Sequence, residues 1–189
     1  MASAGTYHLP FDRFSEWLER WHRRHPDVRL VVQHGPSRPV DGAENHVTLP
    51  YAQLLDLCRA ADAVVLQGGA GGIMDMRAIG VVPVVVPRVP GGGEVVDNHQ
   101  LVFTAEMARL GLLHRAVSES ELAALLAAAL DQRIVVRTHS QPPTPGVQTA
   151  RVLIENGVDP TTVGTMLFRL GWSIWALLAA RLRLRRSAQ

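Results

Sequence analysis

The chain has 189 residues, 47% of them hydrophobic, which is the size and apolar content of one globular domain with a short appendage. Its formal net charge is only +2. Four arginines crowd the last nine residues, Arg181, Arg183, Arg185 and Arg186, so the basicity is local and the body of the chain offers no case for binding nucleic acid. The one cysteine, Cys58, excludes an internal disulfide framework and is expected to pack as a small apolar side chain. The opening residues, MASAGTYHLPF, have no basic segment followed by an apolar one, so we expect no secretory signal and a cytoplasmic protein.

Short apolar runs bounded by turn residues alternate with helical patterns, which predicts βαβ units and a mostly parallel sheet. The predicted strands, in chain order, are residues 1–5, 28–33, 46–49, 63–66, 82–86 and 112–116. The predicted helices are residues 11–24, 51–60, 72–79, 98–110 and 119–130. The fold class is therefore α/β, with a Rossmann-like, mostly parallel sheet.

The alternation stops after residue 131, where a strand-like stretch at 134–137 leads into the helix-breaking sequence SQPPTPG at 140–146. We therefore predict a compact domain at 1–131, a linker at 132–160 and a hydrophobic and basic C-terminal helix at 161–189. Its uncharged part, residues 170–180, is far shorter than the roughly 20 residues of a membrane-spanning helix. Two interpretations stay open: a helix docked on protein, or a helix lying on a membrane surface with its arginines toward the lipid head groups.

Two segments with glycine follow predicted strands, where an open parallel sheet binds its ligands. The first is Gly5-Thr6, and the second is the glycine-rich turn QGGAGG at 67–72. Glycines let the backbone approach a diphosphate, and the start of the next helix favours its negative charge. The alternative is that these glycines only form a tight turn between strand and helix.

A third segment, PRVPGGGEVVDNHQ at 87–100, also follows a predicted strand, and its polar side chains suit hydrogen bonds to sugar hydroxyls. The alternative is a capping box in which Asp97 caps the next helix and Gln100 reaches back, the pattern that Ser118-x-x-Glu121 repeats. Asp75 is predicted in the first turn of the helix after the glycines, within reach of a ribose diol if a nucleotide lies there.

The eight histidines are scattered and have no spacing typical of a metal site, so we predict neither a metal nor another cofactor.

Together these segments resemble the C-terminal half of family 28 glycosyltransferases over residues 1–130. The residues that carry the resemblance are Gly5-Thr6 with Pro10-Phe11-Asp12-Arg13, the glycine-rich turn, and Pro87-Arg88 followed by Glu94-x-x-Asp97-x-His99-Gln100. The resemblance implies the donor half of the GT-B architecture, metal-independent transfer from a UDP-sugar and a polyprenyl-linked acceptor. Within the family the chain is most similar to the stand-alone subunit of two-chain enzymes that make lipid-linked sugars in N-glycosylation and exopolysaccharide synthesis. This implies a membrane-anchored, acceptor-binding partner subunit and a peripheral location at the inner face of the membrane.

By the same resemblance, the family's ribose-binding Glu corresponds to Asp75, and its sugar-binding Gln corresponds to Gln100. The family's turn His-Gly-Gly-x-Gly-Thr reads QGGAGG here, so the His and the Thr hydroxyl are both replaced. The donor-binding residues that the resemblance and the motifs imply are Gly5, Thr6, Gly68, Gly69, Gly71, Gly72, Asp75, Arg88, Glu94, Asp97, His99 and Gln100.

Glycosyl transfer needs a base for the acceptor hydroxyl and stabilisation of the departing UDP. The candidate bases in this chain are His8 and Glu94, although the family normally places its base in the other half of the enzyme. The helix-start amides, with Arg88, are expected to stabilise the departing diphosphate. Two other interpretations remain: a dinucleotide-binding oxidoreductase, because Gly69-Ala-Gly71 resembles part of a Rossmann fingerprint, and a non-catalytic binding or regulatory subunit that keeps the fold.

Overall fold

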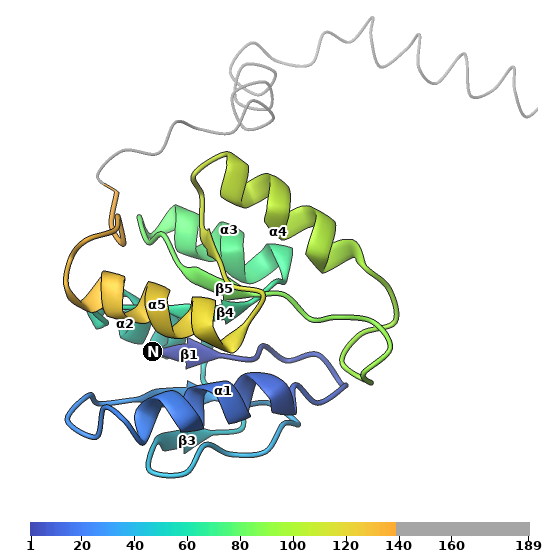
Figure 1. Ribbon diagram of the computed structural model, residues 1–189, viewed down its shortest axis with the longest axis horizontal. Coiled ribbons are helices and arrows are strands. Elements are labelled where there is room, and N and C mark those ends of the chain that lie inside the picture. Colours follow the sequence, from blue (N-terminus) through green and yellow to red (C-terminus); the bar gives the residue numbers. More distant parts are fainter. Residues whose placement is uncertain (139–189) are drawn as a thin grey trace, which may run out of the picture. The chain divides into compact units, whose positions relative to one another are not determined.

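The computed structural model describes residues 1–138, and the predicted C-terminal helix at 161–189 lies outside them (Figure 1). The centre of the described domain is a six-stranded sheet in which all neighbouring strands run parallel, in the order β3-β2-β1-β4-β5-β6. This arrangement confirms the predicted α/β class and parallel sheet. The strands are β1 (Ala2–Ser3), β2 (Val31–Gln33), β3 (Glu44–His46), β4 (Val65–Gln67), β5 (Val84–Val86) and β6 (His114–Arg115).

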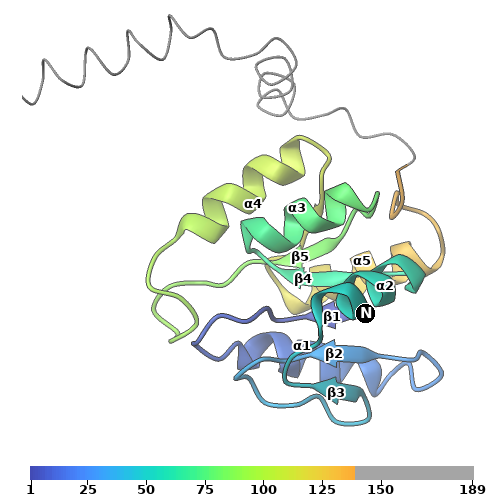
Figure 2. The same cartoon turned by 180° about the vertical axis from the view of Figure 1, so that it is seen from behind.

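Five helices cover the two faces of this sheet within the described residues (Figures 1 and 2). One face carries the first and last helices, and the other carries the three between them. The strand order reverses direction between β1 and β4, so helices leave these two neighbouring strands toward opposite faces. The helices are α1 (Asp12–His22), α2 (Tyr51–Ala60), α3 (Ala70–Ala78), α4 (His99–Arg109) and α5 (Glu119–Leu130).

The side-chain alternation of the buried strands builds a separate core on each face. Val84 and Val86 of β5 belong to the cluster that includes Phe14 and Leu18 of α1. Val85, between them, points to the other cluster. Cys58 of α2 is fully buried in that second cluster, as predicted, and its burial raises the pKa of the thiol.

Several predicted boundaries differ from the structure. All six strands have only two or three residues and are shorter than predicted. The prediction of a strand at 46–49 is wrong in its position, because β3 pairs with β2 through Glu44–His46 and shares only His46 with the predicted range. Helix α3 begins at Ala70, two residues before the predicted start, so the last two glycines of the turn are already helical. The stretch at 134–137 is no strand of the sheet, since Arg137 forms only an isolated antiparallel bridge with Val81.

Residues 132–138, predicted as the start of a linker, are hydrogen-bonded to the domain. The guanidinium of Arg137 donates to the carbonyls of Cys58, Arg59 and Ala61 at the end of α2. The backbone N–H of Thr138 donates to the carbonyl of Gly80. No helix in this described part of the chain is long and apolar enough to cross a bilayer.

The predicted cap of α5 by Ser118 is confirmed, and Glu121 reaches back one residue beyond the N-cap position of a standard capping box. The Ser118 hydroxyl accepts a hydrogen bond from the N–H of Glu121, and the Glu121 carboxylate accepts one from the N–H of Val117. The helix then buries Leu122 and Leu126 against the core. The capped start thus fixes which face of α5 meets the sheet.

Replacing Leu122 with alanine should lower the free energy of unfolding by about 2 to 5 kcal/mol, because this side chain is 1% exposed and the substitution leaves a cavity. Val117→Ala, at a position that is 45% exposed, is the matched control and should change stability by no more than about 0.5 kcal/mol. Urea denaturation of both variants measures the difference. Equal losses would show that α5 does not pack as described.

Candidate functional site

A cavity of about 440 Å³ lies at the carboxyl ends of β1 and β4, where the strand order reverses. Open α/β sheets bind their ligands at this place, because the loops diverge there and leave a crevice. The cavity brings together six of the residues predicted from sequence: Gly5, Thr6, Gly69, Gly71, Gly72 and Asp75.

The start of α3 gives the cavity its anion-binding character. Ile73 is the first residue of this helix whose N–H bonds back along the chain, to the carbonyl of Gly69. The N–H groups of Ala70, Gly71 and Gly72 therefore have no intrahelical acceptor. A Cβ at Gly71 would meet nothing within 4 Å, so a ligand can approach this turn closely. Because no Arg, Lys or His of the described part of the chain lines the cavity, these helix-start amides are its main positive feature.

The first two glycines of the turn, and Gly5, lie against side chains of the protein itself. A Cβ at Gly69 would lie 2.1 Å from Gln67 Nε2, and one at Gly68 would lie 2.9 Å from Gln100 Oε1. Gly5, which has φ of +76°, likewise sits against the Gln67 amide, because a Cβ on Gly5 would lie 3.0 Å from Gln67 Nε2. These glycines make room for two glutamine side chains of the protein itself.

Asp75 lines the cavity from the second turn of α3, and the prediction that it lies in the first turn is wrong, because the helix begins at Ala70. Its carboxylate accepts a hydrogen bond of 2.8 Å from the Tyr51 hydroxyl. This bond raises the pKa of Tyr51. Tyr51 also lines the cavity, so the pair presents a hydroxyl and a carboxylate side by side at its rim.

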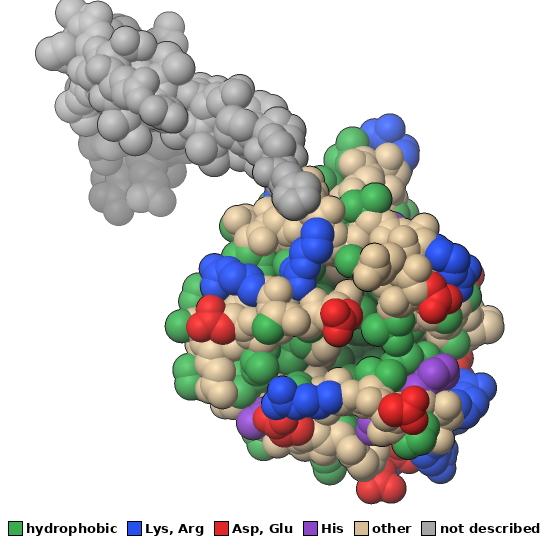
Figure 3. All heavy atoms as spheres, turned by 90° about the vertical axis from the view of Figure 1, so that its left-hand side faces the viewer, with side chains coloured by type: hydrophobic (Ala, Val, Ile, Leu, Met, Phe, Trp, Pro, Cys, Tyr) green, Lys and Arg blue, Asp and Glu red, His purple; other side chains and the backbone are tan. Residues whose placement is uncertain are grey.

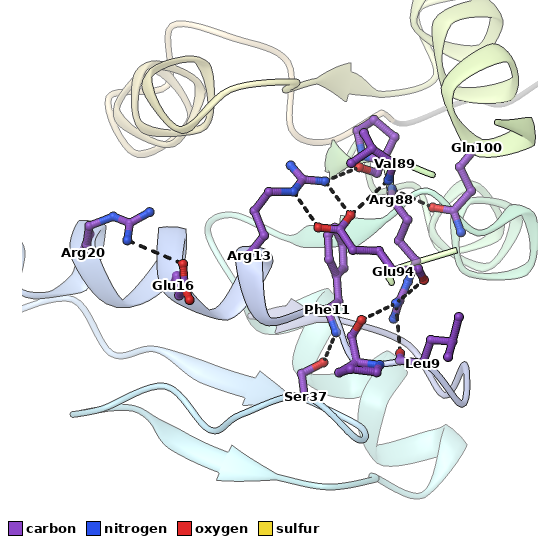
Figure 4. A network of polar contacts seen from close by, with 12 residues as sticks. Leu9, Phe11, Arg13, Glu16, Arg20, Ser37, Arg88, Val89, Glu94 and Gln100 are labelled. Atoms are coloured by element: carbon purple, nitrogen blue, oxygen red, sulfur yellow. Dashed lines mark hydrogen bonds and ion pairs between the residues drawn. The ribbon is translucent and has the colours of Figure 1, made fainter. Parts of the chain in front are cut away.

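Arg88 is fully buried outside the cavity lining and holds two loops together (Figure 4). Its guanidinium donates to the carbonyls of Ala4, Leu9 and Pro10 in the loop after β1 and to that of Glu94 in the loop after β5. Its Cζ lies 4.6 Å from the centre of the Phe11 ring. Burial lowers the pKa of this guanidinium. Arg88 was predicted to help stabilise a departing diphosphate. This role does not fit the geometry, because every hydrogen bond that the Arg88 guanidinium forms goes to a backbone carbonyl.

Glu94 is also part of this loop contact (Figure 4). Its carboxylate accepts hydrogen bonds of 2.7 and 2.8 Å from the Arg13 guanidinium and one of 3.0 Å from the N–H of Val89. A carboxylate engaged by both arms of an arginine is poorly suited to take a proton from a substrate, so we assign Glu94 a structural role. His8, the other candidate base, is exposed and packs against the Tyr7 ring.

The capping alternative for Asp97 and Gln100 is wrong in part. Helix α4 begins at His99 after Asn98, with no side-chain cap. The Asp97 carboxylate accepts hydrogen bonds from the backbone N–H and the ring of the exposed His99, and these bonds lower the pKa of Asp97. Gln100 does not reach back to Asp97; it is buried and accepts a hydrogen bond from the N–H of Arg88.

Sequence reasoning did not include four polar residues of the cavity wall among the predicted donor-binding residues: Ser3, Gln33, Tyr51 and Gln67. Gln33 ends β2, donates to the Ser3 hydroxyl and accepts from the N–H of Leu49. Gln33 could have been found from the sequence, because it is a polar residue at the end of a buried apolar strand. Tyr51 had no such signal, because its contact with Asp75 joins two separate helices. Among the described residues, no group of three or more His, Cys, Asp or Glu side chains is placed to hold a metal ion.

A second cavity, of about 240 Å³, opens at the amino ends of the strands (Figure 3). Figure 3 shows hydrophobic side chains in a central hollow surrounded by charged groups. Its wall is mainly apolar and includes Leu18, Trp21, Leu57 and Leu126. None of the five described helices begins at this cavity, so the carboxyl-end cavity is the better candidate for a charged ligand.

The family model of the glycosyltransferase family 28 C-terminal domain matches residues 15–142. The chain belongs to this family. The match includes the glycine-rich turn, Asp75 and the segment from Arg88 to Gln100, whereas Gly5 and Thr6 precede it.

Relatives of known name are sugar transferases. The chain is 34% identical over 136 residues to a UDP-N-acetylglucosamine--N-acetylmuramyl-(pentapeptide) pyrophosphoryl-undecaprenol N-acetylglucosamine transferase of Saccharopolyspora erythraea, covering 71% of this chain and 35% of that protein. A transferase of the same name from Nocardia farcinica is 37% identical over 101 residues, covering 50% of this chain and 25% of the relative. The chain therefore spans about a third or less of the length of these relatives.

Two solved structures share the fold of this family 28 domain. Acinetobacter baumannii MurG superposes with a TM-score of 0.50 at 19% identity, covering 82% of this chain and 49% of that one. The glycotransferase of kitacinnamycin gives a TM-score of 0.52 at 23% identity, covering 70% of this chain and 35% of that one. Both support the GT-B type of sheet predicted from the sequence.

Arg88→Lys should lower the free energy of unfolding by about 3 kcal/mol or more, because a lysine cannot reach four carbonyls and leaves buried acceptors unpaired. Arg109→Lys, which alters an exposed ion pair with Glu106, is the control and should cost less than about 1 kcal/mol. Chemical denaturation measures both. A small loss at Arg88 would contradict its role in joining the loops.

Proposed function

We propose that this family 28 domain binds a UDP-sugar at the carboxyl-end cavity and serves as the donor half of a glycosyltransferase. The observation that carries the proposal is the row of free amides at the start of α3 beside Asp75, at the point where the strand order reverses. The amides suit the diphosphate, and the carboxylate of Asp75 suits the ribose diol. The names of the relatives support N-acetylglucosamine as the sugar. The glycine-rich turn follows β4, whereas a dinucleotide fingerprint follows the first strand, which disfavours the oxidoreductase interpretation.

We further propose that the acceptor is a polyprenyl-linked sugar and that another chain, a membrane-anchored subunit, presents it. Transfer requires a base near the acceptor hydroxyl, and in the described domain Glu94 is paired with Arg13 while His8 does not line the cavity. The donor half thus holds the nucleotide and stabilises its departure, and the base comes from elsewhere.

The purified chain should bind UDP-N-acetylglucosamine yet leave an undecaprenyl-linked acceptor unmodified. Transfer by the chain alone would contradict the two-chain proposal.

UDP should bind to the purified chain with the same affinity in excess EDTA as in Mg²⁺, because the diphosphate is expected to bind to the helix-start amides of α3 and not to a metal ion. Isothermal titration calorimetry in the two buffers measures the affinities. Titration with inorganic phosphate alone is the control for non-specific anion binding and should give at most weak heats. Binding that disappears on chelation would overturn the metal-free site.

Asp75→Ala should weaken UDP and UDP-N-acetylglucosamine alike, by about 10- to 100-fold, since it removes a charged acceptor from the ribose of both ligands. Asp56→Ala is the matched control: Asp56 is exposed on α2, pairs with Arg59 and does not line the cavity. Competition binding with a fluorescent UDP derivative measures both variants. An unchanged UDP affinity in Asp75→Ala would remove Asp75 from the site.

The C-terminal segment at 161–189 is proposed to hold the domain against the cytoplasmic face of a membrane, near the lipid-linked acceptor. Its sequence combines an apolar stretch with arginines, each worth about 1 kcal/mol near anionic lipid. The full chain should float with anionic liposomes and less with neutral ones, while a chain ending at Gly157 should not. Equal flotation of the two chains on anionic liposomes would exclude this role and leave a contact with protein.

A further inference from the structure

Two glutamine side chains, Gln67 and Gln100, meet at the edge of the carboxyl-end cavity, next to the glycine-rich turn. Gln67 ends β4 and lines the cavity, whereas Gln100 comes from the first turn of α4 and is 5% exposed. Gln100 Nε2 lies 2.9 Å from Gln67 Oε1. The two amides therefore form one hydrogen-bonded pair whose outer member faces the ligand space.

The direction of this pair is set by the backbone. The N–H of Arg88 can only donate, and it donates to Gln100 over 3.0 Å, so the atom that receives it must be the Gln100 carbonyl oxygen. The NH₂ group of Gln100 must then donate to the carbonyl of Gln67. The NH₂ group of Gln67 is left as the terminal donor, with no acceptor among the described residues.

The position of this terminal donor points to its ligand. Gln67 Nε2 lies against both Gly5 and Gly69, the two glycines from the loops after β1 and β4. It therefore stands at the point where the sheet order reverses, beside the free amides at the start of α3. An NH₂ donor next to helix-start amides complements an oxygen that carries negative charge.

We propose that Gln67, not Gln100, presents its amide to the bound donor, as a hydrogen-bond donor to the diphosphate, and that Gln100 is a positioning residue that fixes the orientation of Gln67. This inference rests on the proposed function, since it assigns a contact within the same cavity. It gives the polar residue in the first position of the QGGAGG turn a direct role. Gln100, with its carbonyl engaged by Arg88 and its amide by Gln67, acts on the ligand through its neighbour.

Gln67→Glu is the direct test, because a carboxylate still accepts the Gln100 NH₂ group but offers no donor and adds a negative charge. Calorimetry on the full-length chain should show UDP affinity reduced by about tenfold or more, with uridine affinity changed by less than about twofold. Gln132→Glu makes the same charge change at an exposed position after α5 and should leave both affinities unchanged. Wild-type UDP affinity in Gln67→Glu would overturn the proposal.

Gln100→Glu tests the positioning role. Its carboxylate can accept from the N–H of Arg88 but cannot donate to Gln67, so the Gln67 amide turns over and presents its carbonyl to the diphosphate. The ratio of UDP to uridine affinity should fall as in Gln67→Glu, a change that loss of stability alone does not produce. If Gln100→Glu alters affinity for UDP-N-acetylglucosamine but not for UDP, Gln100 reads the sugar directly and the proposal is overturned. A wild-type chain that binds neither uridine nor UDP would instead overturn the proposed function.

Discussion

The guanidinium of Arg88 is the contact on which the loops around the carboxyl-end cavity depend. It lies buried between two loops far apart in the sequence and donates to carbonyls of both. The ion pair of Glu94 with Arg13 adds a second link, between the loop after β5 and the start of α1. The backbone N–H of Arg88 also begins the amide pair that ends at Gln67. One residue thus fixes the loop after β1, the loop after β5 and the donor at the floor of the cavity.

The carboxyl-end cavity suits a negatively charged group through oriented dipoles in place of cationic side chains. No Arg, Lys or His among residues 1–138 lines the cavity, so its positive potential comes from the amides of α3 and the amide of Gln67. Such donors are held in place by the fold and need little reorganisation when a diphosphate leaves. The same arrangement explains the glycines, because those at positions 5, 68 and 69 leave room for the glutamines, while a Cβ at Gly71 would meet nothing within 4 Å and leaves the start of α3 open.

Local sequence signals predicted the parts of the fold that local interactions determine. The bounds of α2 and α5 agree with prediction, since Pro50 precedes one helix and Ser118 caps the other. The parallel sheet and the location of the glycine-rich turn at a strand end followed from periodicity and spacing. The roles of Arg88 and Gln100 could not be predicted this way, because their partners lie on other loops. Arg88 reaches Leu9 across 79 positions of sequence, and no pattern along the chain marks that contact.

UDP is proposed to bind where β1 and β4 end, between the loop at Gly5 and the start of α3. Amide chemical-shift mapping by nuclear magnetic resonance during a UDP titration locates the bound nucleotide without any substitution. We predict that the largest shifts fall on Gly5, Gly71 and Gly72 and that the side-chain NH₂ signals of Gln67 move with them. Shifts concentrated instead around the apolar hollow at the amino ends of the strands, at Leu30 and Ala61, would contradict this claim.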